Sequence, residues 1–181
     1  MAIDVHVIFT KEDGTTIQGE STTQVTLPSS LGGGPANAAV RLSSFAMETE
    51  NVVSIGSATS GAGAGKAKLD PLAITRHFDQ ASPALFQLSA AGSHLRQVEF
   101  IVSQTGAAPG APSKPFLVFT FTLVFVQTIS WSYSDGDDNL TETINLEYGA
   151  VSMKYLNTST NTVSTGAWDQ ITNNPNPPPV S

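Results

Sequence analysis

The sequence predicts a mainly β protein, a β-barrel or β-sandwich of about eight strands with one short helix. Apolar and polar residues alternate over residues 3–9, which is typical of a half-buried strand. Residues 116–133 are dense in β-branched and aromatic side chains, which favours a fully buried strand or strand pair. Only residues 82–92 carry both the start signal and the stop signal of a helix.

A polar, glycine-rich segment, residues 21–37, follows the first strand and is predicted to be a long loop with a short strand at residues 24–27. Strand character returns at residues 40–47 and near residues 52–55. Residues 56–65 contain only Gly, Ala, Ser and Thr, a composition that predicts a flexible excursion from the domain.

The helix is predicted from its end signals and from its apolar face. Ser82 is a good N-cap residue, and Pro83 suits the first helical position because its missing N–H is not needed there. Leu85 and Leu88 lie one turn apart and form the face that docks on the sheets. Gly92 is predicted to end the helix in the left-handed conformation.

Strands with one apolar face are predicted on both sides of the helix. Leu72, Ile74 and Phe78 form such a face before it, and Val98, Phe100 and Val102 form one after it.

The last strands end in a bent segment and a polar tail. Residues 135–139 predict an exposed hairpin turn. Apolar residues then switch parity at Gly149 and Ala150, which predicts a β-bulge that bends the strand as barrels require. Residues 169–181 are predicted to be a flexible tail rich in Pro and Asn, following a single domain over residues 1–168.

Composition restricts the classes of partner. The chain has 181 residues, of which 40% are hydrophobic and only 13% charged, so one globular domain with a polar, sparsely charged surface is expected. A net charge of -7 with eight scattered basic residues argues against nucleic-acid binding. With no Cys, the chain has no disulfide framework and no thiolate metal site.

The N-terminus predicts no signal peptide, because it lacks a basic region and places Asp4 inside its only apolar stretch. The longest apolar run, residues 116–126, is far shorter than the roughly 20 residues of a membrane-spanning helix. We therefore expect synthesis in the cytoplasm, no membrane association, and export only by a dedicated route.

Motifs that carry chemistry are incomplete. Residues 61–66 (GAGAGK) resemble a phosphate-binding loop, but Ser60 replaces the required first Gly and Ala67 replaces the Ser or Thr after the Lys. Asp135, Asp137 and Asn139 have the oxygen spacing of a calcium loop, yet Leu140 and Leu146 stand at its Gly and Glu positions.

The three histidines, His6, His77 and His94, lie far apart with no metal-binding spacing. We accordingly predict no catalytic residue, no metal and no cofactor.

Several segments, taken in order, resemble the haemolysin-coregulated protein (Hcp) family of bacterial type VI secretion. Gly19, Glu20 and Ser21 are similar to the family's G-E-S entry after the first strand. Residues 74–83 (ITRHFDQASP) look like its F-T-K-x-x-D-K-x-S-P segment, and residues 85–94 continue this similarity to the A/S-G-x-H ending. Residues 140–155 are similar to its T-E-x-V-x-L-N-F strand pair, and Gly166 to Trp168 to a late G-W element.

The resemblance implies a β-barrel of two sheets with one flanking helix, and a structural rather than enzymatic role. Six subunits would close into a ring, and rings would stack into a secreted tube that carries effectors in its lumen and has sheath and spike proteins as partners. Residues 22–37 look like an insertion relative to the family. The alternative from a different class is a β-sandwich that binds carbohydrate or a surface receptor, which requires exposed aromatic side chains in a groove.

The family resemblance also places an extended inter-ring loop at residues 56–65. The residues expected to stack rings on one another are Gly56, Ser60, Gly61, Gly63, Gly65 and Lys66.

Overall fold

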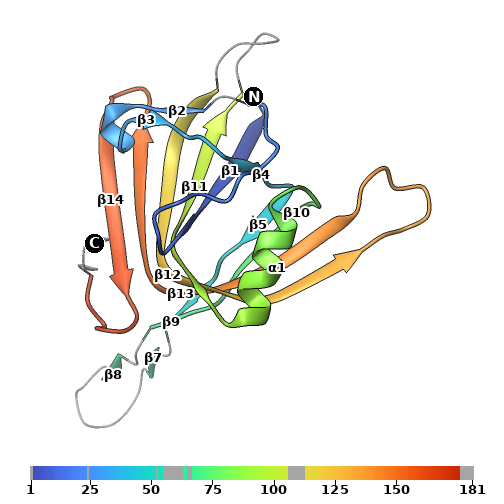
Figure 1. Ribbon diagram of the computed structural model, residues 1–181. Helices are drawn as coiled ribbons and strands as arrows, with labels where there is room; N and C mark the ends of the chain where they lie inside the picture. Colours follow the sequence, from blue (N-terminus) through green and yellow to red (C-terminus); the bar gives the residue numbers. More distant parts are fainter. Residues whose placement is uncertain are drawn as a thin grey trace.

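The computed structural model describes residues 2–23, 25–51, 53–54, 63–64, 67–105 and 113–175. This part of the chain is built on one large curled antiparallel sheet with a single α-helix, α1 (Ser82–Ala91) (Figure 1). The mainly β fold with one short helix is thus confirmed. The sheet contains eight strands: β1 (Ile3–Lys11), β4 (Val40–Arg41), β5 (Ser44–Ala46), β10 (Leu72–His77), β11 (His94–Gln104), β12 (Lys114–Ser132), β13 (Thr141–Asn157) and β14 (Thr162–Asp169).

Three small two-stranded ladders lie outside this sheet. They pair β2 (Thr26–Leu27) with β3 (Gly34–Pro35), β6 (Thr49–Glu50) with β9 (Lys68–Leu69), and β7 (Val53–Ser54) with β8 (Gly63–Ala64). A short 3-10 helix, η1 (Ser29–Leu31), connects β2 to β3.

The segment containing β4 and β5 closes the sheet into a barrel. The strand order is β4-β1-β11-β12-β13-β10-β5, so β4 and β5 occupy opposite ends although only two residues separate them. The N–H of Leu42 donates to the carbonyl of Val5 on β1 (2.9 Å), and the N–H of Ser43 donates to the carbonyl of Thr75 on β10 (2.8 Å). The single strand expected at residues 40–47 is therefore two short strands, because its halves pair with different edges.

A bend shared by three strands divides the barrel wall into two halves. In a regular strand, residues three apart point to opposite faces. Here pairs three apart on β11, β12 and β13 all point into the core, so the alternation is interrupted between them. These pairs are Leu95 and Val98, Phe121 and Val124, and Tyr148 and Val151.

The interruption predicted at Gly149 and Ala150 thus lies at the correct place, but it is a bend shared by neighbouring strands and not a β-bulge. Ala150 pairs with Thr122 and Tyr148 pairs with Val124, so β12 and β13 keep their register across the bend. Leu123, which lies between these pairs on β12, has a φ of 51°, an uncommon left-handed conformation for a residue with a side chain. The two predicted sheets are two halves of one sheet that bend together.

The predicted loop over residues 22–37 forms a second hydrophobic core outside the barrel. Val25, Leu31 and Ala36 are buried, and they belong to the same cluster as Ile8 and Ile101 of the barrel wall. This segment covers the face of β1 that was expected to meet solvent. The half-buried prediction for β1 is therefore wrong, since residues on both of its faces are buried.

His6 lies two residues before Ile8 on the same face of β1 and is also buried. Its side chain is 0% exposed, and among the described residues neither ring nitrogen has a hydrogen-bond partner. Burial lowers the pKa of His6, because the charged imidazolium would lose its hydration there. Burial likewise raises the pKa of Glu99, which is paired across the β1–β11 ladder with Ile8.

Two boundaries differ from the sequence prediction. Phe78 follows the end of β10 and is exposed, whereas Arg76 occupies the buried face that Phe78 was expected to share with Leu72 and Ile74. At the C-terminal side, β14 continues through Asp169, one residue beyond the predicted domain boundary, and Asn174 forms a bridge back to it.

Gly149 lies at the shared bend in close contact with Leu123 and Ile171, and its replacement tests this packing. A Cβ at residue 149 would lie 3.0 Å from Cδ1 of Ile171 and 3.3 Å from Cβ of Leu123. We expect Gly149→Val to lower the free energy of unfolding by about 1–3 kcal/mol in urea titrations, because the added methyl groups overpack this contact.

Gly166→Val on β14 is the matched control, since its Cβ would meet its nearest neighbour, Cγ of Met153, at an ordinary 3.6 Å. A loss in the control as large as in Gly149→Val would contradict the close contact. Ile171→Ala in the Gly149→Val background should recover part of the loss.

Candidate assembly site

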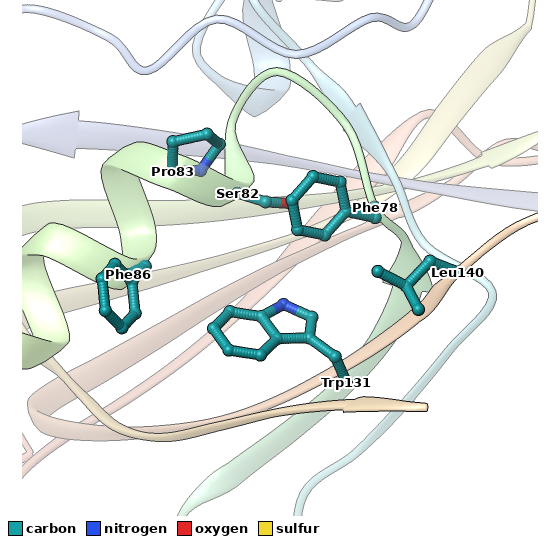
Figure 2. Close-up of a pocket in the computed structure, with 6 residues that line it drawn as sticks. All are labelled: Phe78, Ser82, Pro83, Phe86, Trp131 and Leu140. Carbon is teal, nitrogen blue, oxygen red and sulfur yellow. The ribbon is translucent and has the colours of Figure 1, made fainter. Parts of the chain in front are cut away.

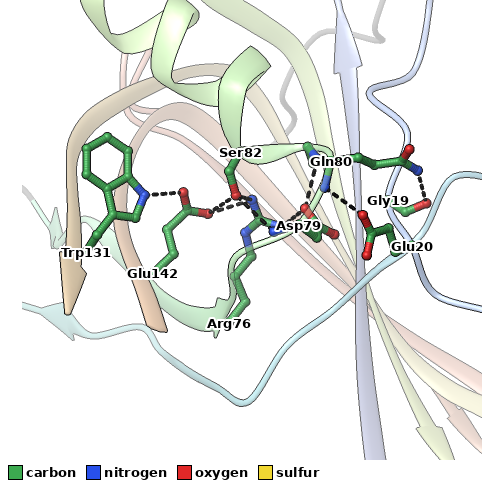
Figure 3. A network of polar contacts seen from close by, with 9 residues as sticks. Gly19, Glu20, Arg76, Asp79, Gln80, Ser82, Trp131 and Glu142 are labelled. Atoms are coloured by element: carbon green, nitrogen blue, oxygen red, sulfur yellow. Dashed lines mark hydrogen bonds and ion pairs between the residues drawn. The ribbon is translucent and has the colours of Figure 1, made fainter. Parts of the chain in front are cut away.

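A buried ion pair joins the start of α1 to the barrel wall (Figure 3). Nη2 of Arg76 on β10 lies 2.5 Å from Oε2 of Glu142 on β13, and both side chains are 0% exposed. The register of the sheet sets this contact, because residues 76 and 142 are directly paired across the antiparallel ladder. The guanidinium also donates to Oδ1 of Asp79 through Nη1, just before the helix.

The hydroxyl of Ser82 completes this network. Its Oγ accepts from Nη2 of Arg76 at 2.8 Å and donates to Oε2 of Glu142 at 3.2 Å. The expectation that Ser82 is the N-cap is wrong, since Ala81 holds that position and Ser82 is the first helical residue. Asp79 instead satisfies a backbone donor at the helix start, because its Oδ1 accepts from the N–H of Ala81 at 2.8 Å.

The other helix residues singled out from the sequence have identifiable surroundings. Leu85 is fully buried in the barrel core, and Leu88 is half-buried and packs against the same cluster. Pro83 is the second helical residue and is exposed. Gly92 has a φ of 64°, and its N–H donates to the carbonyls of Leu88 and Ser89.

An exposed aromatic groove lies beside the start of α1 (Figure 2). It has a volume of about 320 Å³ and an apolar accessible lining. Trp131 lies between Phe86 of α1 on one side and Phe78 on the other, with ring centroids 5.8 Å and 6.5 Å away. The six lining residues are Phe78, Ser82, Pro83, Phe86, Trp131 and Leu140.

The buried network also fixes the orientation of the groove. Nε1 of Trp131 donates to Oε1 of Glu142 at 2.8 Å, so one carboxylate binds Arg76 through one oxygen and Trp131 through the other. This leaves the indole 43% exposed but held in place. A rigid aromatic side chain with large exposed area is a typical anchor in protein–protein interfaces.

Most residues expected to stack rings lie outside the described part of the chain. Gly63 is described and belongs to β8, whose residues pair with β7 in an antiparallel ladder. Together with the β6–β9 ladder, this makes a two-stranded arm that extends away from the main sheet (Figure 1). The residues outside the described ranges are Gly56, Ser60, Gly61, Gly65 and Lys66.

The side chains that could bind a metal or take part in catalysis are dispersed over the part of the chain that the structure describes. No group of three or more His, Asp or Glu side chains within it could hold a metal ion. Asp137 accepts a hydrogen bond from the N–H of Ser134 within its turn, and His94 contacts Glu12 and the ring of Phe125. No described helix is long and apolar enough to cross a membrane.

The fold and site together define a small antiparallel β-barrel protein with one flanking helix and an exposed aromatic groove. A family model described as "Type VI secretion system effector, Hcp" matches residues 9–155. The chain therefore belongs to the Hcp family.

Individual relatives agree with this assignment. The chain is 30% identical to protein hcp1 of Pseudomonas aeruginosa over 90 residues, which is 50% of this chain and 54% of that protein. Two solved structures share the fold at 23% identity: Hcp1 from Salmonella typhimurium, with a TM-score of 0.68, and a type six secretion system protein, with a TM-score of 0.75. In both cases the match covers 96% of this chain and 99% of the other.

Sequence reasoning missed the two main features of this site. Arg76 and Glu142 were not singled out, although each is a charged residue inside an alternating strand pattern at a position that alternation assigns to the core. The groove was missed because its aromatic residues come from three separate segments, and only the β12–β13 register brings Trp131 beside α1.

Breaking the buried pair should be costly, whereas replacing both partners should not. Glu142→Leu leaves the buried Arg76 without its main partner, so we expect a loss of about 3–5 kcal/mol in the free energy of unfolding. The double variant Arg76→Met/Glu142→Leu should recover most of that loss, because it removes both buried charges. Chemical denaturation measures both values.

Asp70→Asn is the control, since it removes an ion pair with Lys68 whose side chain is 67% exposed. This change should cost at most about 1 kcal/mol. If the double variant is as unstable as Glu142→Leu, the ion pair is not the source of the effect.

Proposed function

We propose that this chain is a structural subunit of a type VI secretion inner tube, in which rings of about six copies stack on one another. The observation that carries the proposal is the family match over residues 9–155, which spans the closed barrel except for most of β1, the last two residues of β13 and all of β14. In this role the protein acts through self-assembly. It is made in the cytoplasm, leaves through the type VI apparatus, and has sheath, spike and effector proteins as partners.

The edge of the barrel wall supports self-assembly on physical grounds. β14 pairs with β13, and among the described residues its other edge is covered only by the bridge between Asp169 and Asn174. An exposed strand edge is a template for pairing with another chain unless charges or prolines block it. Residues 162–168 (TVSTGAW) contain neither. Such an edge suits a head-to-tail contact that closes into a ring.

The alternative of a carbohydrate-binding module has one observation in its favour, since Trp131 does lie in an exposed aromatic groove. The family assignment supports assembly instead, and the apolar lining of the groove offers little to sugar hydroxyls. The proposed occupant of such a surface is therefore protein.

Shortening the arm separates ring formation from ring stacking. Ser54 and Gly63 are paired, so a two-residue Asn-Gly turn replacing residues 55–62 would join them as a tight hairpin. We expect light scattering after size-exclusion chromatography to give a ring of about six subunits for both proteins. Electron microscopy should show stacked rings only for the unmodified chain, because the variant lacks the element proposed to contact the next ring.

Replacing residues 135–138, the tip of the β12–β13 hairpin, with the same two-residue turn is the control, and it should leave stacking unchanged. Tubes of normal length from the arm variant would show that a different surface stacks the rings. A monomer at all concentrations for the unmodified chain would contradict the proposed function itself.

A further inference from the structure

The aromatic groove beside α1 has no occupant within the described part of its own chain. Phe78, Phe86 and Trp131 are between 43% and 50% exposed, and the Trp131 ring contacts each of the two phenylalanine rings. Contiguous exposed apolar patches of this kind often mark a site of interaction with a protein or another ligand. The carboxylate of Glu142 holds the indole in place, so the groove is preformed and would lose little entropy on binding.

The same chain contains a segment whose chemistry fits such a groove. Residues 174–181 read NPNPPPVS, with three consecutive prolines at 177–179 and no charged side chain. Proline-rich segments favour the polyproline II conformation, which docks in aromatic-lined grooves at a small entropic cost. The apolar lining of the groove matches uncharged pyrrolidine rings and the side chain of Val180.

From these observations, we propose that residues 176–181 of one subunit dock in the aromatic groove of a second copy of this chain. Asn174 is fixed beside Asp169, which pairs with Ala150 of β13. Trp131 pairs with Glu142, eight residues further along the same strand. That path is about 27 Å at 3.3–3.4 Å per residue.

The six residues beyond Pro175 span only about 19 Å in the polyproline II conformation. Measured along β13, the segment therefore falls short of its own groove. We therefore assign the segment to the groove of a second copy, and this inference rests on the proposed self-assembly.

Cysteine cross-linking tests this docking directly, because the full chain contains no Cys. Two differently tagged chains, one Phe86→Cys and the other Val180→Cys, are co-expressed and then oxidised. Docking should give a disulfide-linked pair of the two chains. The rate should exceed that of the control by about tenfold or more, because docking raises the effective concentration of the two thiols.

Ala91→Cys paired with Val180→Cys is the matched control, since residue 91 is also exposed on α1 but does not line the groove. Replacing prolines 177–179 with Ser in the Val180→Cys chain should reduce the cross-link to the control rate. Equal rates of cross-linking to Val180→Cys for Phe86→Cys and Ala91→Cys would overturn the proposal. The groove would then be expected to bind a different protein.

Two further outcomes separate this inference from the proposed function. If one chain carrying both Phe86→Cys and Val180→Cys closes only on itself, docking occurs within a subunit and the proposal fails. Light scattering on the same samples reports ring formation independently. Normal rings without the cross-link would overturn the docking alone, whereas a specific cross-linked pair without rings would overturn the ring and support the docking.

Discussion

The ion pair between Arg76 and Glu142 is the constraint on which the arrangement of this protein depends. It connects β10, β13, the start of α1 and, through the second carboxylate oxygen, the exposed indole of Trp131. Because both charges are fully buried, any misregister of β10 against β13 would leave them unpaired in a medium of low dielectric. Such a pair adds little net stability, and we interpret its role as specifying one register and one helix position.

The barrel that this pair fixes is closed in an unusual way. A single short segment over residues 40–46 bonds to β1 with one half and to β10 with the other, and the covering segment at residues 25–36 then buries the outer face of β1. Both hydrophobic cores are thus formed by residues of this chain. The edge of β14, the two-stranded arm and the aromatic groove lie at the surface. Residues 162–168 of the β14 edge carry no charge, which would reduce the desolvation cost of burying that edge in the proposed assembly.

Much of the fold could be predicted from the sequence because its signals are local. Alternation located β1 and β11, the parity switch located the bend at Gly149, and the end signals located α1 within one residue. The failures involve contacts between different elements of the fold. Ser82 is an excellent N-cap by local preference, yet its hydroxyl bonds to Arg76 and Glu142 instead, and no local pattern shows that residues 25–36 cover Ile8. The groove likewise exists only through tertiary packing.

Native-state hydrogen exchange tests most directly whether the buried pair unites the helix with the barrel. Leu85 donates to the carbonyl of Ala81 at the start of α1, and Ile74 lies in the middle of β10. If Arg76 and Glu142 bind these elements into one cooperative unit, both amides should exchange with the same free energy of opening, and Glu142→Gln should lower both together. Exchange of the Leu85 amide at a much lower free energy than that of Ile74, with no response to Glu142→Gln, would contradict this account.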